Sequence, residues 1–431
     1  MTTLRASKQG LTKIKQAREK KGWPVADRNW LEAASLCLGV NWEKTGYLAE
    51  GISEGTWSRF LAGKRSINAS AFQAYSAVLG LNWEEVVNGI QGQDWGDAPD
   101  LPSFYGRAEE LAKLKQWIVK DKCRLVAILG MGGIGKTALA VRSAEDIQNE
   151  FKYLIWRSLR ASPPVEEVLA DLIRFFSNDK KTALTDNTDK MVKQLIDYLR
   201  QHRCLVVLDE MEAILSSGKL AGHYREGYQD YSKLLREVGE VKHNSCFVLT
   251  SWENPKIMAS LAEKTKFVQY LKLTGLKDID AQEILTEKGL SDRETWGTLN
   301  QLYGGNPLSL KIVSITIKDF FNGSVAKFLE AGTIVIGDIS EVLDRQFDRL
   351  TDLEKQIVRQ LATNVTPKSL PQLAEILSPP GAKSELIEAL ESLERRSLIE
   401  KITGGSEVMF TLQPVVMKYI QKVSKISSLH L

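Results

Sequence analysis

Short apolar runs alternate with amphipathic stretches through the middle of the chain. Between residues 104 and 274, five runs read as buried strands, and apolar residues recur at helical spacing between them. Strands that alternate with helices favour a parallel sheet covered on both faces. The expected strands are 123–129, 153–159, 203–209, 245–251 and 267–273.

The flanking regions show helical spacing. Residues 1–92 are expected to form an all-α module, with Leu11, Ile14 and Ala17 on one helix face. The stretch 93–103 is rich in Gly, Pro and Asp and reads as a linker. Residues 275–336 are expected to form a helical domain with helices at 278–288, 293–303 and 306–320.

The last region, 337–431, combines helices with a hairpin. Strands are expected at 398–403 and 407–412 around Gly404-Gly405. Helices followed by a Gly-turn hairpin are typical of a winged helix. The helices expected here are 341–348, 352–363, 369–377, 383–396 and 414–424.

Composition is that of an ordinary globular protein, with 43% hydrophobic and 26% charged residues among 431. The net charge of +3 gives no bulk argument for binding to nucleic acid or membrane. The N-terminus is polar, and no apolar run approaches the roughly 18 residues of a membrane helix, so a cytoplasmic protein without membrane contact is expected. The scattered cysteines favour buried free thiols over a disulfide framework or a metal site; they are Cys37, Cys123, Cys204 and Cys246.

One octapeptide carries the clearest chemistry. Residues 130–137 read G-x-x-x-x-G-K-T, after an apolar run and before the helical stretch 137–147. In such a P-loop the glycines let backbone N–H groups surround a phosphate, and the following helix adds its positive end. Lys136 would reach the outer phosphates and the Thr137 hydroxyl would bind Mg²⁺. The sequence therefore predicts an ATP/ADP site with Mg²⁺ in an α/β P-loop NTPase core at 104–274.

Two later strands extend this site. Residues 205–210, LVVLDE, read as a Walker B strand that carries Asp209 to Mg²⁺, while Glu210 would orient or deprotonate the attacking water. Residues 247–252 form a strand expected beside the P-loop strand, where Thr250 or Ser251 would sense the outer phosphate.

Residues 52–64 resemble the second half of a phage-repressor-type helix-turn-helix. Trp57 and Phe60 are expected in the core. The expected outward residues are Thr56, Ser58, Arg59 and Lys64. A small helical adaptor without a DNA role is favoured, because residues 1–95 carry no strongly basic face; DNA binding is the alternative.

Five motifs stand in the order of NB-ARC proteins, which are STAND-class signal-transduction ATPases: FYGRAEEL, GMGGIGKT, LVVLDE, VLTSW and GGNPLSL. The resemblance covers about 103–425, and the N-terminal region is similar to the helix-turn-helix-like module ahead of such ATPases in bacteria. The resemblance to NB-ARC proteins implies a switch that holds ADP in a closed form, with the winged helix packed against the nucleotide. ATP exchange would open it and drive self-association, with slow hydrolysis as the reset.

The resemblance also implies a set of site residues. Lys136 and Glu210 would be catalytic, and Thr137 and Asp209 would hold Mg²⁺. Tyr105 to Arg107 fall where the family's linker approaches adenine, and Pro307 falls on the proline that packs against the base. The implied nucleotide-binding residues are Tyr105, Gly106, Arg107, Met131, Gly132, Gly133, Ile134, Gly135, Lys136, Thr137, Ala138, Ser251, Pro307 and Gln413.

The sequence departs from the family pattern at three positions. Trp252 replaces the arginine that commonly follows Thr-Ser after the fourth strand, and Glu210 stands where many members have Asp. Gln413 replaces the winged-helix histidine that touches the ADP β-phosphate, and an amide cannot become cationic. We therefore expect the closed form to be held less firmly, or by other contacts.

Two other functions fit parts of the pattern. An ATP-responsive DNA-binding transcription regulator would use the helix-turn-helix-like start, and a processive AAA-plus ATPase would use the same nucleotide core. The switch reading places unknown protein signalling partners on residues 1–92. Relatives usually carry a repeat sensor after the winged helix, so a fragment, a short member or a separate sensor chain are all open.

Overall fold

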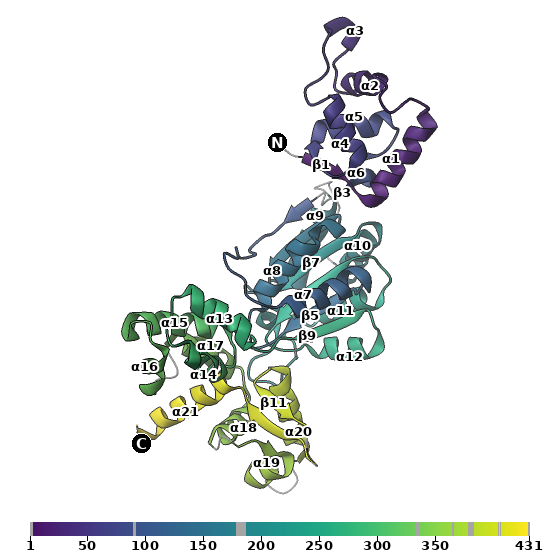
Figure 1. Cartoon of the computed structure of the whole chain (residues 1–431). Helices are drawn as coiled ribbons and strands as arrows, with labels where there is room; N and C mark the ends of the chain where they lie inside the picture. Colours follow the sequence, from purple (N-terminus) through teal and green to yellow (C-terminus); the bar gives the residue numbers. More distant parts are fainter. Residues whose placement is uncertain are drawn as a thin grey trace. The chain divides into compact units, whose positions relative to one another are not determined.

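A computed structural model describes residues 3–88, 92–177, 187–332, 337–363, 366–377, 383–403, 405 and 407–429. The chain divides into two compact units (Figure 1). The first comprises Met1–Gln93 with Gln148–Tyr153, and the second comprises Asp94–Ile147 with Leu154–Leu431. The finer domain boundaries expected from the sequence stay predictions.

The first unit is helical but not all-α. Three very short strands form an antiparallel sheet in the order β2-β1-β3, so the all-α prediction was wrong. Strands of two to four residues are too short to show the two-residue alternation that marks a strand. The strands are β1 (Thr3–Ala6), β2 (Ile67–Asn68) and β3 (Val87–Asn88), and the helices are α1 (Lys8–Lys21), α2 (Asn29–Cys37), α3 (Trp42–Thr45), α4 (Glu54–Ala62), α5 (Ala69–Val78) and α6 (Trp83–Val86).

An aromatic cluster forms the core of this unit. Trp30 and Trp57 stack with ring centroids 5.0 Å apart, and Phe60 and Tyr75 pack beside them, which confirms Trp57 and Phe60 as core residues. Ser58, Arg59 and Lys64 are exposed as predicted. Thr56 is not outward: its hydroxyl lies 2.9 Å from the Tyr75 hydroxyl and belongs to the capping box that starts α4.

A mainly parallel sheet is the centre of the second unit. Its order is β4-β6-β7-β8-β5-β9; β5 pairs in parallel with β8 and β9, and β7 with β8. All five predicted strands are confirmed, and β4 (Gly92–Asp94) is an unpredicted edge strand. The others are β5 (Leu125–Leu129), β6 (Tyr153–Ser158), β7 (Cys204–Asp209), β8 (Cys246–Ser251) and β9 (Val268–Lys272).

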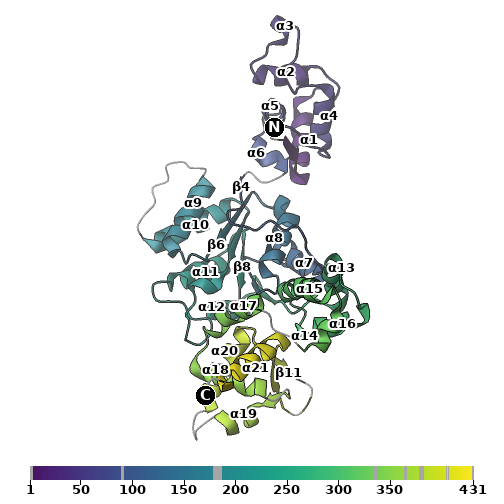
Figure 2. The ribbon, with the colours of Figure 1, turned by 90° about the vertical axis from the view of Figure 1, so that its left-hand side faces the viewer.

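Helices cover both faces of this sheet, as its fully buried strands require. Figure 2 shows α9, α10 and α11 on one side and α7 and α8 on the other. The bounds are α7 (Ala108–Lys115), α8 (Lys136–Ile147), α9 (Val165–Ser177), α10 (Thr188–Gln201), α11 (Asp230–Glu240) and α12 (Lys256–Lys264), with the π-helical segment η1 (Gln116–Lys120) and the 3-10 turn η3 (Met211–Ile214). The 3-10 turn η2 (Gln148–Glu150) belongs to the first unit.

The C-terminal half of the second unit is helical with one small sheet. The predicted hairpin is confirmed as antiparallel β11 and β12, and an unpredicted β10 adds a third strand in the order β10-β12-β11. Gly404 lies outside the described residues, and the winged-helix assignment stays a prediction. The elements are α13 (Asp278–Glu287), η4 (Arg293–Thr295), α14 (Trp296–Leu302), α15 (Pro307–Phe321), α16 (Val325–Glu330), α17 (Gly337–Phe347), α18 (Asp352–Thr363), β10 (Lys368–Ser369), α19 (Leu370–Leu377), α20 (Lys383–Arg395), β11 (Ile399–Ile402), β12 (Met409–Leu412) and α21 (Pro414–Leu429).

Two sequence expectations concern membrane-spanning helices and thiols. Cys123, Cys204 and Cys246 are buried free thiols, as predicted, whereas Cys37 is exposed. Across the described ranges, no helix has both the length and the apolar character that a membrane crossing needs.

A buried histidine beside β8 gives a pH prediction. His243 accepts a hydrogen bond at Nδ1 from Ser245 N (3.2 Å), and its Nε2 lies 2.9 Å from Val238 O. These bonds suit the neutral ring, and burial lowers the pKa of His243 from 6.5 to about 4. Because the folded pKa is depressed, this stabilisation is present above pH 6.5 and is lost as pH falls toward 4.

Thermal unfolding across this pH window checks the prediction. The loss should amount to on the order of 3 kcal/mol at the acid end. His243→Gln should flatten the fall of the unfolding midpoint between pH 6.5 and 4. An equal fall in the variant and the wild type would contradict this assignment.

Candidate functional site

The glycine-rich loop lies between β5 and α8, at the carboxyl end of the sheet. Gly133 and Gly135 have φ of 75° and 99°, conformations that residues with a Cβ rarely adopt. Helix α8 begins at Lys136, so its N-terminal N–H groups face the loop, as phosphate binding requires. The local structure predicted for the octapeptide is thus present.

Lys136 is buried inside this loop. Its Nζ donates to the carbonyls of Gly130 (2.9 Å) and Met131 (3.1 Å). Burial lowers the pKa of Lys136 to about 8, while the nearby charge of Glu212 opposes the shift. The ammonium group therefore lies within the loop and is held by main-chain atoms.

Thr137 and Asp209 lie together, as the two-part site requires. The Thr137 hydroxyl donates to Asp209 Oδ1 at 3.0 Å, and the Thr250 hydroxyl donates to the same oxygen. Burial raises the pKa of Asp209 above its ordinary value, although both hydroxyl bonds oppose this. A hydroxyl and a carboxylate are the hard oxygen donors that Mg²⁺ prefers, so the pair fits this ion.

The two acids after Asp209 have different surroundings. Glu210, with φ of 61°, accepts a hydrogen bond from Ser158 Oγ (2.8 Å) and pairs with Arg160 at 3.5 Å. Its carboxylate is therefore engaged on the β6 side. Glu212, which the sequence analysis did not single out, is buried and accepts a hydrogen bond from Trp252 N (3.3 Å).

Glu212 is electrostatically linked to the loop. Burial raises the pKa of Glu212 to about 7, and the positive charge of Lys136 is the largest opposing influence. No sequence signal marked this residue, because it lies in a short turn after the strand and only the fold brings it near Lys136.

Strand β8 lies directly beside β5, as predicted. Ser251 is paired with Leu129 in the strand register, and the Ser251 hydroxyl accepts a hydrogen bond from Glu253 N at 3.2 Å. Thr250 supports Asp209, as described above. The outer-phosphate sensing expected of these residues stays a prediction.

The GGNPLSL motif packs on the glycine-rich loop. Asn306 Nδ2 donates to Gly132 O (2.9 Å), and Leu308 N donates to Gly133 O (3.3 Å). Pro307 Cγ lies 4.0 Å from the position that a Cβ on Gly135 would occupy. The structure thus brings Pro307 to the loop and adds Asn306, whose position before Pro at a helix start marks it as an N-cap.

The segment Tyr105–Arg107 reaches the same loop from the other side. Arg107 Nη2 donates to Ile134 O (3.1 Å) and Thr274 O (2.7 Å), so this buried guanidinium supports the loop backbone. Tyr105 donates its hydroxyl to Glu287. A Cβ on Gly106 would lie 2.4 Å from Asp280 Cγ, so the chain passes close to α13 here. The adenine contact expected of this segment stays a prediction.

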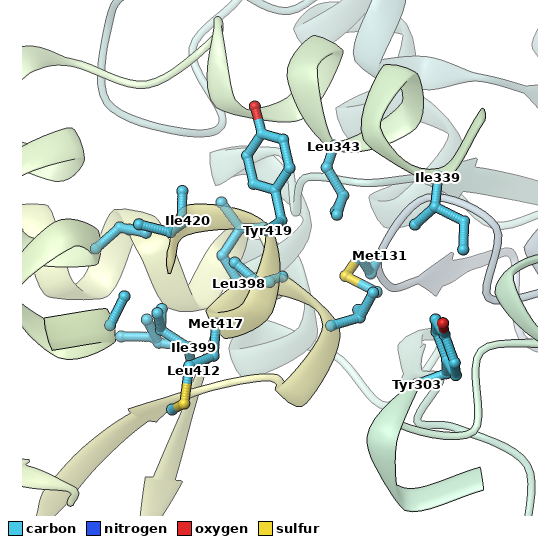
Figure 3. Packing of buried hydrophobic residues seen from close by; sticks show 14 of the residues in the cluster. Met131, Tyr303, Ile339, Leu343, Leu398, Ile399, Leu412, Met417, Tyr419 and Ile420 are labelled. Carbon is cyan, nitrogen blue, oxygen red and sulfur yellow. The ribbon is translucent and has the colours of Figure 1, made fainter. Parts of the chain in front are cut away.

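The C-terminal elements close over the loop. Met131 inserts among Tyr303, Ile339, Leu343 and Leu398 of the hydrophobic cluster (Figure 3). A Cβ on Gly132 would lie 2.8 Å from Val342 Cγ1 of α17. The side of the loop that carries Met131 and Gly132 is therefore covered by the C-terminal elements.

A small cavity remains beside Met131 and Gly132, with Asn306, Val342 and Val415 in its wall. Gln413 lies at the start of α21, where its N–H donates to Leu398 O (3.4 Å) and its carbonyl accepts from Met417 N (2.9 Å). Among its neighbours in the chain, Val415 is the one that lines this cavity. The structure therefore brings α17 and Val415 to the loop, while the role of Gln413 stays a prediction.

A buried ion-pair network, not anticipated from the sequence, ties the C-terminal elements to the end of β8. Glu253 is 1% exposed; its Oε1 accepts from Arg349 Nε (2.7 Å) and from Arg396. Arg396 Nε also lies 3.1 Å from Glu354 Oε1, which accepts a bond from Ser392 Oγ at 2.5 Å. We call these five residues the Glu253 network.

The Glu253 network also holds the loop before α11. Arg396 Nη2 donates to Lys219 O (2.6 Å), and Ala221 N donates to Ser392 Oγ (2.6 Å). Arg349 Nη2 donates to Leu215 O at 3.1 Å. The end of β8 and this loop are thus fastened to the same side chains of α20 and the α17–α18 region.

Comparison with known proteins agrees with this geometry. The model of the NB-ARC domain matches residues 107–214. An uncharacterized WD repeat-containing protein of Nostoc sp. is 46% identical over 97% of this chain and 36% of its own length. The disease resistance-like protein DSC1 of Arabidopsis thaliana is 23% identical over 76% of this chain and 26% of its own length. The chain thus spans about a third or less of these curated relatives.

Among solved structures, the chain is similar to a STAND protein of Pyrococcus horikoshii with a tetratricopeptide repeat sensor. That match has 18% identity and a TM-score of 0.41, and covers 77% of this chain and 44% of the other. The ORC2 protein of Aeropyrum pernix matches with 17% identity and a TM-score of 0.47, over 77% and 98% of the two chains.

Proposed function

Because this chain belongs to the NB-ARC family of STAND P-loop ATPases, we propose that it is an ADP/ATP-dependent molecular switch. The observation that carries the proposal is the contact of the glycine-rich loop with α15 and α17. A nucleotide bound in this loop lies where the C-terminal elements pack. The number of phosphates on the nucleotide would therefore determine how well α15 and α17 pack on the loop.

The chain's own residues would bind the nucleotide in a defined way. Backbone N–H groups of the loop and of α8 would surround the phosphates, and Lys136 would exchange its carbonyl partners for phosphate oxygens. Pro307 would offer an apolar surface to the base. Thr137 and Asp209 would hold Mg²⁺, which would neutralise phosphate charge.

The switch follows from differential affinity. A ligand shifts a two-state equilibrium only by binding one state more tightly than the other. ADP would favour the closed arrangement, in which α17 covers Gly132. The extra phosphate of ATP would favour an arrangement in which α17 has left the loop, and the exposed surfaces would then self-associate.

Hydrolysis would serve as a slow reset. The Glu210 carboxylate is engaged by Ser158 and Arg160, so it must rearrange before it can activate a water. A base that must first leave these partners suits slow hydrolysis, and slow hydrolysis supports a switch over a processive ATPase.

Nucleotide titration with size measurement tests the switch. Nucleotide-free protein should bind both ADP and ATP, and light scattering should show larger assemblies with ATP than with ADP. Equal assembly size in the two nucleotides would contradict the switch, even if both bind.

The magnesium ligands give a separate prediction. Asp209→Asn should retain ADP binding without Mg²⁺ but lose about tenfold or more of the gain in ATP affinity that Mg²⁺ brings, because an amide is a weaker ligand for a hard cation. Calorimetric titration with and without Mg²⁺ checks this. Asp230→Asn, which neutralises an acidic residue at the start of α11, is the control. An unchanged Mg²⁺ response in Asp209→Asn would show that Asp209 does not hold the ion.

The N-terminal unit is proposed as the surface for protein signalling partners. Ser58, Arg59 and Lys64 are exposed on and after α4 and are available for contact. The Nostoc relative is named for WD repeats, and we propose a repeat region of that kind as the source of the activating signal. Duplex DNA binding by the full chain that falls steeply with salt would favour the regulator instead.

A further inference from the structure

A buried amide of α17 lies against the glycine-rich loop. Gln346 is 4% exposed, and its carboxamide oxygen has no hydrogen-bond partner among the residues that the structure describes. A buried polar atom without a partner is destabilising. This side chain therefore costs stability in the arrangement seen, and that cost needs a structural reason.

The position of Gln346 supplies that reason. Its Oε1 lies 3.4 Å, and its Cδ 3.5 Å, from the position that a Cβ on Gly132 would occupy. Val342, one helical turn earlier, touches the same glycine. Helix α17 thus presents one side to the loop, and the amide is the polar group on that side.

The other polar groups nearby are already engaged. Gln346 lines a small cavity together with Glu253, Arg349 and Arg396. Both arginines are bound to Glu253 in the Glu253 network, so neither is free to turn toward the loop. The Gln346 carboxamide has an oxygen without a hydrogen-bond partner, and its NH₂ group can donate two hydrogen bonds.

We propose that Gln346 is a nucleotide-binding residue, whose amide N–H donates to the diphosphate of ADP in the closed form. This is the role that the family resemblance assigns to Gln413, and the inference rests on the proposed function. The carboxamide turns its nitrogen toward the phosphate, since the two ends of an amide are nearly alike in shape. The hydrogen bond would then couple the position of α17 directly to the presence of ADP.

The contact favours ADP over ATP. It forms only while α17 lies on the loop, because the amide belongs to that helix. When ATP displaces α17, the hydrogen bond is lost with the helix. Gln346 therefore raises the affinity of the closed form for ADP and leaves the affinity of the opened form for ATP unchanged. This difference in affinity favours the closed form when ADP is bound.

Substitution at the two glutamines, in the full chain, tests the inference. Gln346→Leu should weaken ADP binding by about tenfold or more, the effect of one hydrogen bond to a charged group, and leave ATP binding nearly unchanged. If Gln346 rather than Gln413 makes this contact, Gln413→Leu should change ADP binding by less than about twofold. Gln201→Leu, at the exposed end of α10, is the matched control. The readout is the ratio of the ADP and ATP dissociation constants from calorimetry.

A second readout separates binding from folding. Without nucleotide, the thermal midpoint of Gln346→Leu should equal or exceed that of the wild type, because an unpaired buried oxygen has been removed. Gln346→Glu should weaken ADP binding more than Gln346→Leu does, because it brings a carboxylate against the phosphates.

The outcomes distinguish this inference from the proposed function. If the wild type binds no nucleotide, both fail. If the wild type binds ADP and Gln346→Leu binds it equally well, or if Gln413→Leu loses as much affinity, only the role of Gln346 fails. Weaker ADP binding together with a lower midpoint and equal loss of ATP binding would indicate a structural role and would also overturn the inference.

Discussion

Replacing Lys136 by alanine is expected to weaken the binding of ADP and ATP by at least about a hundredfold, with the fold intact. The ammonium group is the one cation inside the loop among the described residues, and its two bonds to Gly130 and Met131 carbonyls can be exchanged for charge-assisted bonds to phosphate. Loss of two such bonds accounts for an effect of this size.

The stability of the same variant should change little. Burial lowers the pKa of Lys136 to about 8, so the ammonium is still the main form at neutral pH but is less stable than in water, and its removal relieves that desolvation penalty. Calorimetric titration and thermal unfolding measure the two effects. Lys264→Ala, which removes an exposed lysine at the end of α12, is the control. Unchanged nucleotide affinity in Lys136→Ala would show that the loop is not the binding site.

Replacing Arg396 by methionine is expected to have the largest effect on the closed arrangement. It leaves Glu253 and Glu354 buried without their shared cation. Breaking a buried pair from one side typically costs about 3–5 kcal/mol. Because the Glu253 network joins α20 to the end of β8 and to the 219–221 loop, we expect this packing to open.

The opening should be visible in two ways. Amide exchange at Ala221 and Asn254, whose N–H groups bond to Ser392 and Arg395, should become faster. Bound ADP should also be released faster, because the elements that cover the loop are less firmly held. Lys401→Met, which removes an exposed ion pair with Glu394 on the same C-terminal elements, is the matched control and should leave both rates nearly unchanged.

A double-mutant cycle isolates the pair. If Arg396 acts through Glu253, adding Glu253→Gln to Arg396→Met should cost less than the sum of the two single changes. Strict additivity, or unchanged ADP release in Arg396→Met, would mean that the Glu253 network does not hold the closed arrangement.

The elements predicted correctly from the sequence are those with a long run of apolar residues or with glycines that mark a turn. Strands β5, β7 and β8 are continuous apolar runs, and β11 and β12 flank a Gly-Gly pair in the sequence. The sheet of β1, β2 and β3 was missed because its strands are too short for any alternation to register. Thr56 was wrongly predicted to face outward, because the sequence at a helix start does not show whether a threonine hydroxyl caps the helix or points to solvent.

The candidate site divides in the same way. The loop and Asp209 are local motifs, and the parallel sheet brings their strands near each other, so the Thr137–Asp209 contact followed from sequence. Glu253 meets Arg396 across 143 positions, and Gln346 meets Gly132 through two packed elements. No spacing rule marks such contacts, because they depend on how the C-terminal helices pack on the loop.

In the proposed switch, the glycine-rich loop, Lys136 and the Thr137–Asp209 pair bind a purine nucleotide that the C-terminal elements then cover. The most direct measurement is to purify the protein without added nucleotide, denature it, and identify and quantify the small molecules released by chromatography. We predict close to one ADP per chain, and its loss in Lys136→Ala. Wild-type protein that releases no nucleotide, and binds none when ADP is then supplied, would show that the loop is not a nucleotide site.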